Sequence, residues 1–490
     1  MRRMIFLLTM PLLLAVFGVC AEEAKLLNLQ DAILLGLRYN ANVRTAELQR
    51  VVQKFQLEVA QWQFQPHYTF TTGGSWNTSR YGNQYSPMTQ TWSATPGVSW
   101  DSPIGTTVTA SESNSWAGNN HFSPAMNVSI SQPLISGFGE AVVEAGLEDA
   151  YDAEKTNKLG LKSTIMSQVT STISAYMTVV GAENSVEVDQ EALDRAKTNL
   201  FQTKLYIQAG QNPQSDEVQA EVQVAQALSQ LQLDKSALLV ARYSLLQTIG
   251  LDPNSTIRVV HEVPLEKYRL LPEDKSIKET LANNIDYQTA VIEIANASRS
   301  VMLAKDANRW SLNLTEEYNR GGYVATQGTI VPPVVAPIAA SGGGFNNLIG
   351  NTAYGSTTAL TLTVPIDNKS NQEEVLSAEI GLQTAELNLK QAKQTLIIQT
   401  MSTRDGLVNL ATQIQLEENQ VKLDQQTLQN TQRSYRAGMS SSLQVTQQSQ
   451  TYANDQRSLV VSKIGYFEAL ASFDQMYGHT LDTWGIHVQY

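Results

Sequence analysis

Two short stretches of this chain share one form, and they restrict its fold more than any other feature. Each places a tyrosine before Ala-Gly, then small polar residues, then a new helical run: "LYIQAGQNPQSDEV" at 205–218 and "SYRAGMSSSLQV" at 434–445. A second glycine follows each turn glycine after forty residues, giving the pairs Gly210 and Gly250, and Gly438 and Gly478. Repetition at a fixed spacing is the sequence signature of a duplicated structural unit. The chain is therefore predicted to contain two copies of one arrangement.

Long helices are predicted before both turns. Prolines are absent and glycines are few over 138–206 and over 368–434. At 1.5 Å per residue the first of these helices would be about 100 Å long, whereas the return helix over 212–249 and the next opening helix over 276–308 would cover about 57 and 50 Å. Two short helices placed end to end thus match one long helix. This places the turns at one end of each copy and the strands at the other.

Strands are predicted where apolar and polar residues alternate. The clearest segments are "HYTFTTGGSW" at 67–76, "AMNVSISQP" at 125–133, "RWSLNLTEEY" at 309–318 and "ALTLTVP" at 359–365. Five of the seven tryptophans lie in the two regions that contain these segments, 67–133 and 309–365. Such alternation suits a barrel wall between lipid and a watery lumen, and it also occurs in soluble half-buried sheets. The segment 87–118 resembles a further hairpin, which would either add strands to the wall or form an extracellular flap.

The N-terminus predicts export from the cytoplasm. Two arginines precede an apolar run and small residues, so 1–21 is predicted to be a signal peptide cleaved after Ala21. Lipid attachment at Cys20, the only cysteine, is the alternative, although Val19 is bulky for it. Without its two N-terminal arginines the chain has 32 basic and 46 acidic residues, a net charge of −14, which argues against a nucleic-acid partner.

The strands cannot close a membrane barrel within one chain. No later stretch reaches the roughly 18 to 20 apolar residues of a membrane helix, so any insertion must use strands. The smallest membrane barrels need about eight strands, whereas this chain offers four, or six if 87–118 contributes. The chain is therefore expected to assemble, most simply as a cyclic ring.

The whole mature chain resembles the TolC family of outer-membrane efflux proteins. The resemblance rests on "LNLQDAILLGLRYNANVRTAE" near the start, "QPLISGFGEAVVEAGLE" after the second strand region, and the two Tyr…Ala-Gly turns. It implies a mainly α fold with a membrane β-barrel: a homotrimer with a 12-stranded barrel in the outer membrane and a helical tunnel in the periplasm. The two repeats would span 22–270, with strands within 67–135, and 271–490, with strands within 309–366.

The resemblance also implies a function and partners. The chain would be the outer-membrane channel of a tripartite export system, passing small molecules or secreted proteins from an inner-membrane pump through a periplasmic adaptor. The pump would be an ABC or a proton-driven transporter. Two alternatives from other classes remain: a periplasmic coiled-coil scaffold without a pore, and a stand-alone porin.

Both turns carry candidate functional residues by this resemblance. In the family the hairpin tips touch the adaptor, which gives as docking candidates Ala209, Gly210, Gln211, Ala437, Gly438 and Met439. The same segments hold a gate in the family, through a tyrosine, acidic residues and an arginine. Tyr435 matches the gate tyrosine and Asp216 the first aspartate.

The second turn departs from the family pattern. Ser440 stands where the arginine is expected, and Gln444 and Gln447 stand where aspartates are expected. We therefore expect amide and hydroxyl hydrogen bonds to close the gate, each worth about 1 kcal/mol net, and we expect it to open readily and to respond weakly to divalent cations. Solvated helix positions are the alternative for the two glutamines, and a charge favoured by the helix dipole is the alternative for Asp216.

Catalysis finds no support in the sequence. The histidines are scattered without metal-ligand spacing, and no nucleophile motif or phosphate-binding loop occurs. Paired carboxylates such as Glu373 with Glu374 are interpreted as solvated helix faces. The chain is expected to be neither an enzyme nor a cofactor-binding or metal-binding protein.

Overall fold

The structure is a computed structural model that describes residues 25–78, 80–82, 84–85, 88–117, 121–260, 272–321 and 354–488. The predicted signal peptide with Cys20, and the segment 322–353 between the last two strands, lie outside the described residues. The chain divides into two compact units. The strand unit comprises 46–163 and 281–397; the helical unit comprises residues up to 45, 164–280 and 398–489. Each unit therefore contains segments of both predicted repeats.

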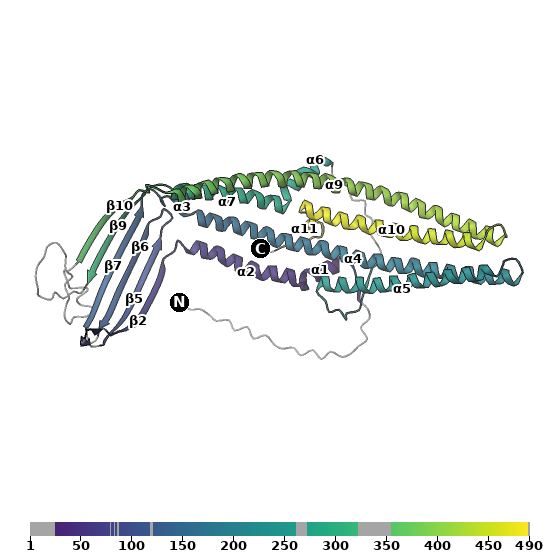
Figure 1. The fold of residues 1–490 in the computed structure, drawn as a ribbon, viewed down its shortest axis with the longest axis horizontal. Coiled ribbons are helices and arrows are strands. Elements are labelled where there is room, and N and C mark those ends of the chain that lie inside the picture. The colour runs from purple at the N-terminus through teal and green to yellow at the C-terminus, as the bar shows by residue number, and fades with distance from the viewer. Residues whose placement is uncertain are drawn as a thin grey trace, which may run out of the picture. The chain divides into compact units, whose positions relative to one another are not determined.

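A six-stranded antiparallel sheet dominates the strand unit, in the order β10-β9-β7-β6-β5-β2 (Figure 1). The strands are β2 (His67–Asn77), β5 (Thr89–Asp101), β6 (Thr107–Ala117), β7 (His121–Pro133), β9 (Ser311–Gly321) and β10 (Tyr354–Thr363). Two short strands, β3 (Arg80–Tyr81) and β4 (Gln84–Tyr85), pair separately. The four segments predicted from alternation all form strands of the main sheet.

The segment 87–118 adds two strands to this sheet. Alternation continues through it, and β5 and β6 pair with each other and with the flanking strands β2 and β7. The resemblance to the family implies four strands per chain, whereas the described sheet of this chain has six.

The register gives the sheet two chemically different faces, because residues opposite each other in an antiparallel pair share a face. One face, which we call the apolar face, carries the aromatic and aliphatic residues of all six strands; typical members are Tyr68, Trp92, Trp116, Val128, Leu314 and Leu360. The other, which we call the hydroxyl face, is built mainly of threonine and serine; typical members are Thr71, Thr95, Thr109, Ser129, Thr315 and Thr361.

The helices of the strand unit follow directly from the strands. They are most of α2 (Ala41–Trp62), α3 (Glu140–Val143), α7 (Ile285–Ala307), and the first parts of α4 (Ala145–Gln208) and α9 (Lys369–Arg436). The single helix predicted from residue 138 is interrupted at Glu144, whose ψ of 0° ends α3 before α4 begins. A buried ion pair between Arg50 of α2 and Glu154 of α4 ties two of these helices together.

The helical unit contains two helical hairpins. α4 returns as α5 (Ser215–Ile249), and α9 returns as α10 (Ser442–Tyr477), as Figure 1 shows. The unit also contains β1 (Lys25–Leu27), α1 (Leu29–Tyr39), β8 (Ile257–Val259), most of α6 (Glu273–Asn283) and α11 (Thr480–Thr483). None of the helices in the described residues combines the length and the apolarity that a membrane-spanning helix needs.

The opening helix of each copy is broken at one asparagine, which the sequence analysis did not predict. Asn40 separates α1 from α2, and Asn284 separates α6 from α7; both have an extended backbone, with ψ of 130° and 126°. The Asn40 side chain accepts a hydrogen bond from the Asn42 amide, and the Asn284 side chain accepts one from the Tyr287 amide. Asparagine is a preferred N-cap because it satisfies a free amide in this way. The two breaks are further evidence of the duplication.

The core of the helical unit lies between α1, α4, α5 and the β1–β8 pair. Its fully buried members include Ile33, Val169, Leu245 and Ile249. The Tyr176 hydroxyl donates to the carbonyl of Leu27 and accepts from the amide of Val260, both at 3.1 Å, so it bridges the parallel pair. The forty-residue glycine repeat marks equivalent helix ends, because Gly250 and Gly478 cap α5 and α10 with the same φ of +74°.

We predict that Gly250→Ala lowers the melting temperature of the purified protein much more than Gly210→Ala. Both glycines have a left-handed φ, of +74° and +69°, which costs an L-residue roughly 1 kcal/mol. An added Cβ at Gly250 would lie 2.5 Å from the Tyr39 carbonyl oxygen, whereas nothing lies within 4 Å at Gly210. Equal melting temperatures would contradict close packing of α5 against the end of α1.

Candidate functional site

The two turns at the ends of the helical hairpins have the same backbone geometry. In the first, the Gly210 amide bonds to the Ile207 carbonyl at 2.9 Å and the next amide bonds to Tyr206 at 2.8 Å. In the second, the Gly438 amide bonds to Tyr435 at 3.0 Å and the next amide bonds to Ser434 at 2.9 Å. This pair of bonds defines the Schellman motif, which needs a left-handed residue at the glycine position. Glycines 210 and 438 supply it, with φ of +69° and +74°.

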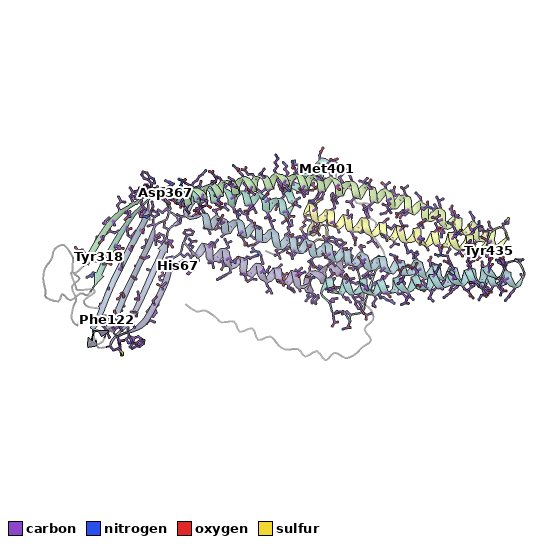
Figure 2. The ribbon with its side chains drawn as sticks, in the orientation of Figure 1. His67, Phe122, Tyr318, Asp367, Met401 and Tyr435 are labelled. Atoms are coloured by element: carbon purple, nitrogen blue, oxygen red, sulfur yellow. The ribbon has the colours of Figure 1, made fainter. Side chains whose placement is uncertain are left out.

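Tyr435 is buried beside these turns, with 4% of its surface exposed. Figure 2 shows it near the end of the hairpin formed by α9 and α10. Its hydroxyl lies 3.1 Å from the Thr203 hydroxyl of α4 and accepts a hydrogen bond from the Asn212 amide group at 3.1 Å. Its ring packs edge-on against Tyr206, with ring centroids 5.3 Å apart. Tyr435 of the second hairpin is thus held by residues of the first.

Asn212 connects Tyr435 to Asp216. Its side-chain nitrogen also donates to the Asp216 carboxylate at 3.3 Å. Tyr435 and Asp216, the two residues that matched the family gate, are therefore brought together through one intervening amide.

Two further positions extend the contact between the hairpins. The Thr203 hydroxyl lies 3.3 Å from that of Ser442, and the Asn199 side chain donates to Ser442 at 3.3 Å and to Thr446 at 3.2 Å. Ser442 and Thr446 are in the first turns of α10. We refer to the connected group as the tip cluster, and its members are Asn199, Thr203, Asn212, Asp216, Tyr435, Ser442 and Thr446.

The other three predicted gate residues lie outside the tip cluster. The Ser440 hydroxyl donates to the Gln444 side chain at 2.6 Å, and the Gln444 amide donates to the hydroxyl of Ser441 at 3.3 Å. With the reciprocal bond from Gln444 to the Ser441 backbone this forms a capping box at the start of α10. Gln447 is exposed. These residues organise one helix end and make no side-chain hydrogen bond to the first hairpin.

The predicted docking residues are all exposed at the turns: Ala209, Gly210, Gln211, Ala437, Gly438 and Met439. The polar contacts that join the hairpins lie beneath them. Five members of the tip cluster were not predicted from the sequence: Asn199, Thr203, Asn212, Ser442 and Thr446. A signal was available, since Asn199 with Thr203 and Ser442 with Thr446 have the i, i+4 spacing that places two side chains on one helix face.

Each hairpin also contains a pair of facing aspartates away from the turn. Burial and a hydrogen bond to Asp234 of α5 raise the pKa of Asp189 in α4 to about 6, although Arg457 of α10 donates to the same carboxylate at 2.8 Å. A hydrogen bond to Asp424 of α9, together with burial, raises the pKa of Asp455 in α10 to about 6. In each pair the neighbouring carboxylate raises the pKa because two ionised carboxylates in contact repel each other.

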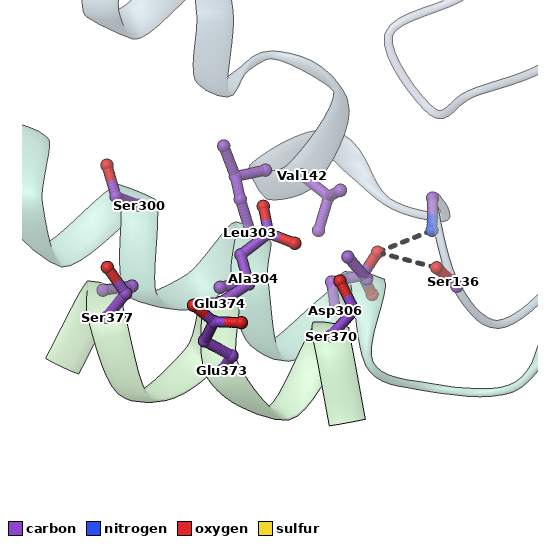
Figure 3. A pocket seen from close by; sticks show the side chains of 13 residues that line it. Ser136, Val142, Ser300, Leu303, Ala304, Asp306, Ser370, Glu373, Glu374 and Ser377 are labelled. Atoms are coloured by element: carbon purple, nitrogen blue, oxygen red, sulfur yellow. Dashed lines mark hydrogen bonds between the residues drawn. The ribbon is translucent and has the colours of Figure 1, made fainter. Parts of the chain in front are cut away.

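A cavity of about 810 Å³ lies in the strand unit where α7 and α9 meet the link between β7 and α3 (Figure 3). Asp306 at its edge accepts from the Gly137 amide at 2.6 Å and from the Ser136 hydroxyl at 3.4 Å, so its carboxylate holds this link in place. The described residues contain no cluster of His, Cys, Asp or Glu that fits a metal ion. The cavity supplies no set of groups that suggests a reaction.

The sequence profile described as "Outer membrane efflux protein" matches residues 276–479 of this chain. No individually curated protein matches the chain.

Several solved outer-membrane channels have a similar fold. CusC is 15% identical, with a TM-score of 0.68 over 92% of each chain. VceC of Vibrio cholerae is 13% identical, with a TM-score of 0.68 over 92% of this chain and 96% of that one. The MtrE outer membrane channel of Neisseria gonorrhoeae, solved in its open state, is 17% identical, with a TM-score of 0.65 over 92% of this chain and 89% of that one. The predicted fold, with long helical hairpins and antiparallel strands, is confirmed.

We predict that Tyr435→Phe loosens the turns without unfolding the hairpins. The variant keeps the ring but loses hydrogen bonds to Thr203 and Asn212, worth about 1 kcal/mol each. Amide hydrogen exchange over 199–216 and 431–446 should become roughly tenfold faster, whereas Tyr206→Phe should leave it near the wild-type rate. Unchanged exchange in Tyr435→Phe would show that the tip cluster does not hold the hairpins together.

We predict that Asp455→Asn stabilises the protein at pH 7.5 and has little effect at pH 4. Because the pKa of Asp455 is raised in the folded protein to about 6, its stabilising contribution is complete below about pH 4 and is lost as the pH rises through 6. An amide next to Asp424 removes the repulsion that develops at high pH. Thermal melting across this pH range tests this, with Asp405→Asn on an exposed surface as the control; a variant less stable than wild type at pH 7.5 would refute it.

Proposed function

We propose that the chain belongs to the outer membrane efflux protein family, the TolC family of non-enzymatic outer-membrane channels, and that it is the outer-membrane channel of a tripartite export system. In this proposal an inner-membrane pump, either ABC or proton-driven, delivers small molecules or secreted proteins through a periplasmic adaptor. The signal peptide over 1–21 would direct export of the chain. The observation that carries the proposal is the two-faced sheet of the strand unit.

That sheet has the chemistry of a wall between lipid and water. Its apolar face carries aromatic residues near both strand ends, for example Trp100 near one end and Trp116 near the other. Aromatic residues at both interfaces and an alternating polar lining are typical of membrane barrels. A soluble coiled-coil scaffold would not be expected to expose so large an apolar surface. On soluble proteins such a surface marks a site of contact with another protein or a membrane.

Assembly as a trimer would complete the wall. TolC-family channels form trimers, and the outer strands β2 and β10 each have a neighbour on one side only among the described strands. Closed barrels leave no strand edge in the membrane, where unpaired backbone groups cost several kcal/mol each. A stand-alone porin would have to close its barrel from one chain, and the six strands of the described sheet are too few.

The hairpin turns would form the periplasmic end. We propose that the exposed residues at 209–211 and 437–439 contact the adaptor, and that the tip cluster beneath them keeps the closed state. The hydrogen bonds of Tyr435 join two hairpins of one chain through neutral groups, and Asp216 is the only carboxylate among them. Neutral hydrogen bonds are individually weak, so this closure would open under modest force from a docked partner.

Single-channel recording in planar bilayers tests the channel and its gate together. Wild-type protein should open in brief events, and Tyr435→Phe and Asp216→Ala should open for longer at the same voltage. Ser440→Ala is the matched control, because the Ser440 hydroxyl donates to Gln444 at the start of α10 and lies outside the tip cluster.

Two results would contradict the proposal. Persistent electrical silence from folded protein that washes off membranes in carbonate would favour the scaffold. A conductance that is the same in the wild type and in every variant with a substitution in the tip cluster would favour a pore without a periplasmic gate.

A further inference from the structure

We propose that the hairpin β5–β6 is part of the membrane wall, so that three copies form an eighteen-stranded barrel with a wide mouth for bulky hydrophilic cargo. This inference rests on the proposed channel function. The resemblance to the family implied twelve strands, and the difference lies entirely in this hairpin. An extracellular flap would leave twelve strands in the wall.

The register shows no break where the hairpin joins the sheet. β5 pairs with β2 from Ser99 opposite His67 to Thr89 opposite Asn77, and β6 pairs with β7 from Thr107 opposite Ser131 to Ala117 opposite His121. β5 and β6 have 13 and 11 residues. Tilted strands of about 9 to 11 residues cross a bilayer, so both are long enough.

An aromatic row on the apolar face crosses the hairpin without interruption. Trp92 of β5 lies opposite Trp116 of β6, and these two are flanked by Trp76 of β2 and Phe122 of β7. The Trp76 and Trp92 rings meet edge-on at 5.5 Å, and the Trp116 and Phe122 rings stack at 5.1 Å. Membrane barrels carry such girdles at the level of the lipid headgroups. The hairpin therefore shares its membrane boundary with both neighbouring strands.

The turn of the hairpin is fixed to the link between the sheet and its helices. The Ile104 carbonyl accepts a hydrogen bond from the Gly139 amide at 3.3 Å, and the Thr106 hydroxyl bonds to Gln132 of β7. Gly105, with φ of +95°, packs so closely that an added Cβ would lie 2.6 Å from the Gly137 carbonyl oxygen. A flap that swings away from the wall would lose all of these contacts.

The strand directions allow three copies to close one ring. Neighbouring strands alternate in direction across the sheet, and an even number of strands places β2 antiparallel to the β10 of a second copy. Neither outer strand contains Lys, Arg, Asp, Glu or Pro, the residues that usually block pairing at an edge.

An eighteen-stranded barrel would admit larger solutes at its mouth than a twelve-stranded one. Barrel diameter grows roughly in proportion to strand number, so eighteen strands give a mouth about one and a half times as wide as twelve. Within the strands the hydroxyl face carries acidic groups only at Glu317 and, at the end of β5, at Asp101. A wide lining of hydroxyl groups favours large hydrophilic solutes and discriminates weakly by charge.

Three charged residues interrupt the apolar face: Glu112, Glu316 and Arg320. They lie on β6 and β9, which flank β7, and the Glu316 carboxylate accepts hydrogen bonds from Ser356, at 2.9 Å, and from Thr358. This polar patch is confined to one part of the face, and the positions chosen for the test avoid it.

Single-cysteine labelling in proteoliposomes tests the hairpin directly, because the one cysteine of the sequence, Cys20, lies within the predicted signal peptide and would be removed with it. A charged, membrane-impermeant maleimide should label Thr95→Cys and Ser111→Cys on the hydroxyl face at least tenfold faster than Ala94→Cys and Ala110→Cys on the apolar face. In β7, Asn127→Cys and Val128→Cys supply the matched reference pair.

The outcomes separate the inference from the function on which it rests. Alternating labelling in both the hairpin and β7 supports the eighteen-stranded wall. Alternation in β7 with equal labelling of all four hairpin positions means that the hairpin is a flap, which overturns this inference and leaves the channel intact. Equal labelling in β7 as well means that the sheet is not a membrane wall, which overturns the proposed function itself.

Discussion

The two outer strands of the sheet, β2 and β10, each present one row of backbone N–H and C=O groups that has no neighbouring strand among the described residues. In water such edges are a liability, and in lipid they are prohibitively costly. In the proposed channel the apolar face lies in lipid, so each edge requires a partner strand, and a second copy of the chain would provide a complementary one. The proposed assembly, closed wall and lumen all follow from this need to satisfy backbone groups.

The two copies resemble each other closely in their helices but differ in the number of strands that they contribute. Both opening helices break at a capped asparagine, both hairpins turn through a Schellman glycine, and both return helices end at a left-handed glycine. The first copy contributes four strands to the sheet and the second two, because only the first contains the hairpin β5–β6. The tip cluster is also unequal, since Tyr435 of the second hairpin inserts among polar residues of the first.

Local patterns in the sequence were sufficient for the elements and the turns. Alternation marked all the strand regions, and the Ala-Gly signature located both turns. Long-range contacts could not be predicted from these local patterns. Asn212 lies between Tyr435 and Asp216, and Asn199 contacts Thr446, only because of how the two hairpins pack, which no local spacing encodes. The resemblance to the family pointed to Tyr435 and Asp216, which lie in the tip cluster. It also pointed to Ser440, Gln444 and Gln447, whose side chains lie at the start of α10 or face solvent. The sequence left the strand number open between four and six, and the described sheet has six.

Electron cryomicroscopy of the purified protein in lipid nanodiscs tests most directly the claim that open-edged six-stranded sheets complete one another. The expected reconstruction is a threefold ring of eighteen strands, in which β2 of each copy is hydrogen-bonded to β10 of the next and the hydroxyl face lines the lumen. A single copy whose sheet edges stay uncovered in lipid, or a ring that closes while β5 and β6 lie outside it, would contradict that claim.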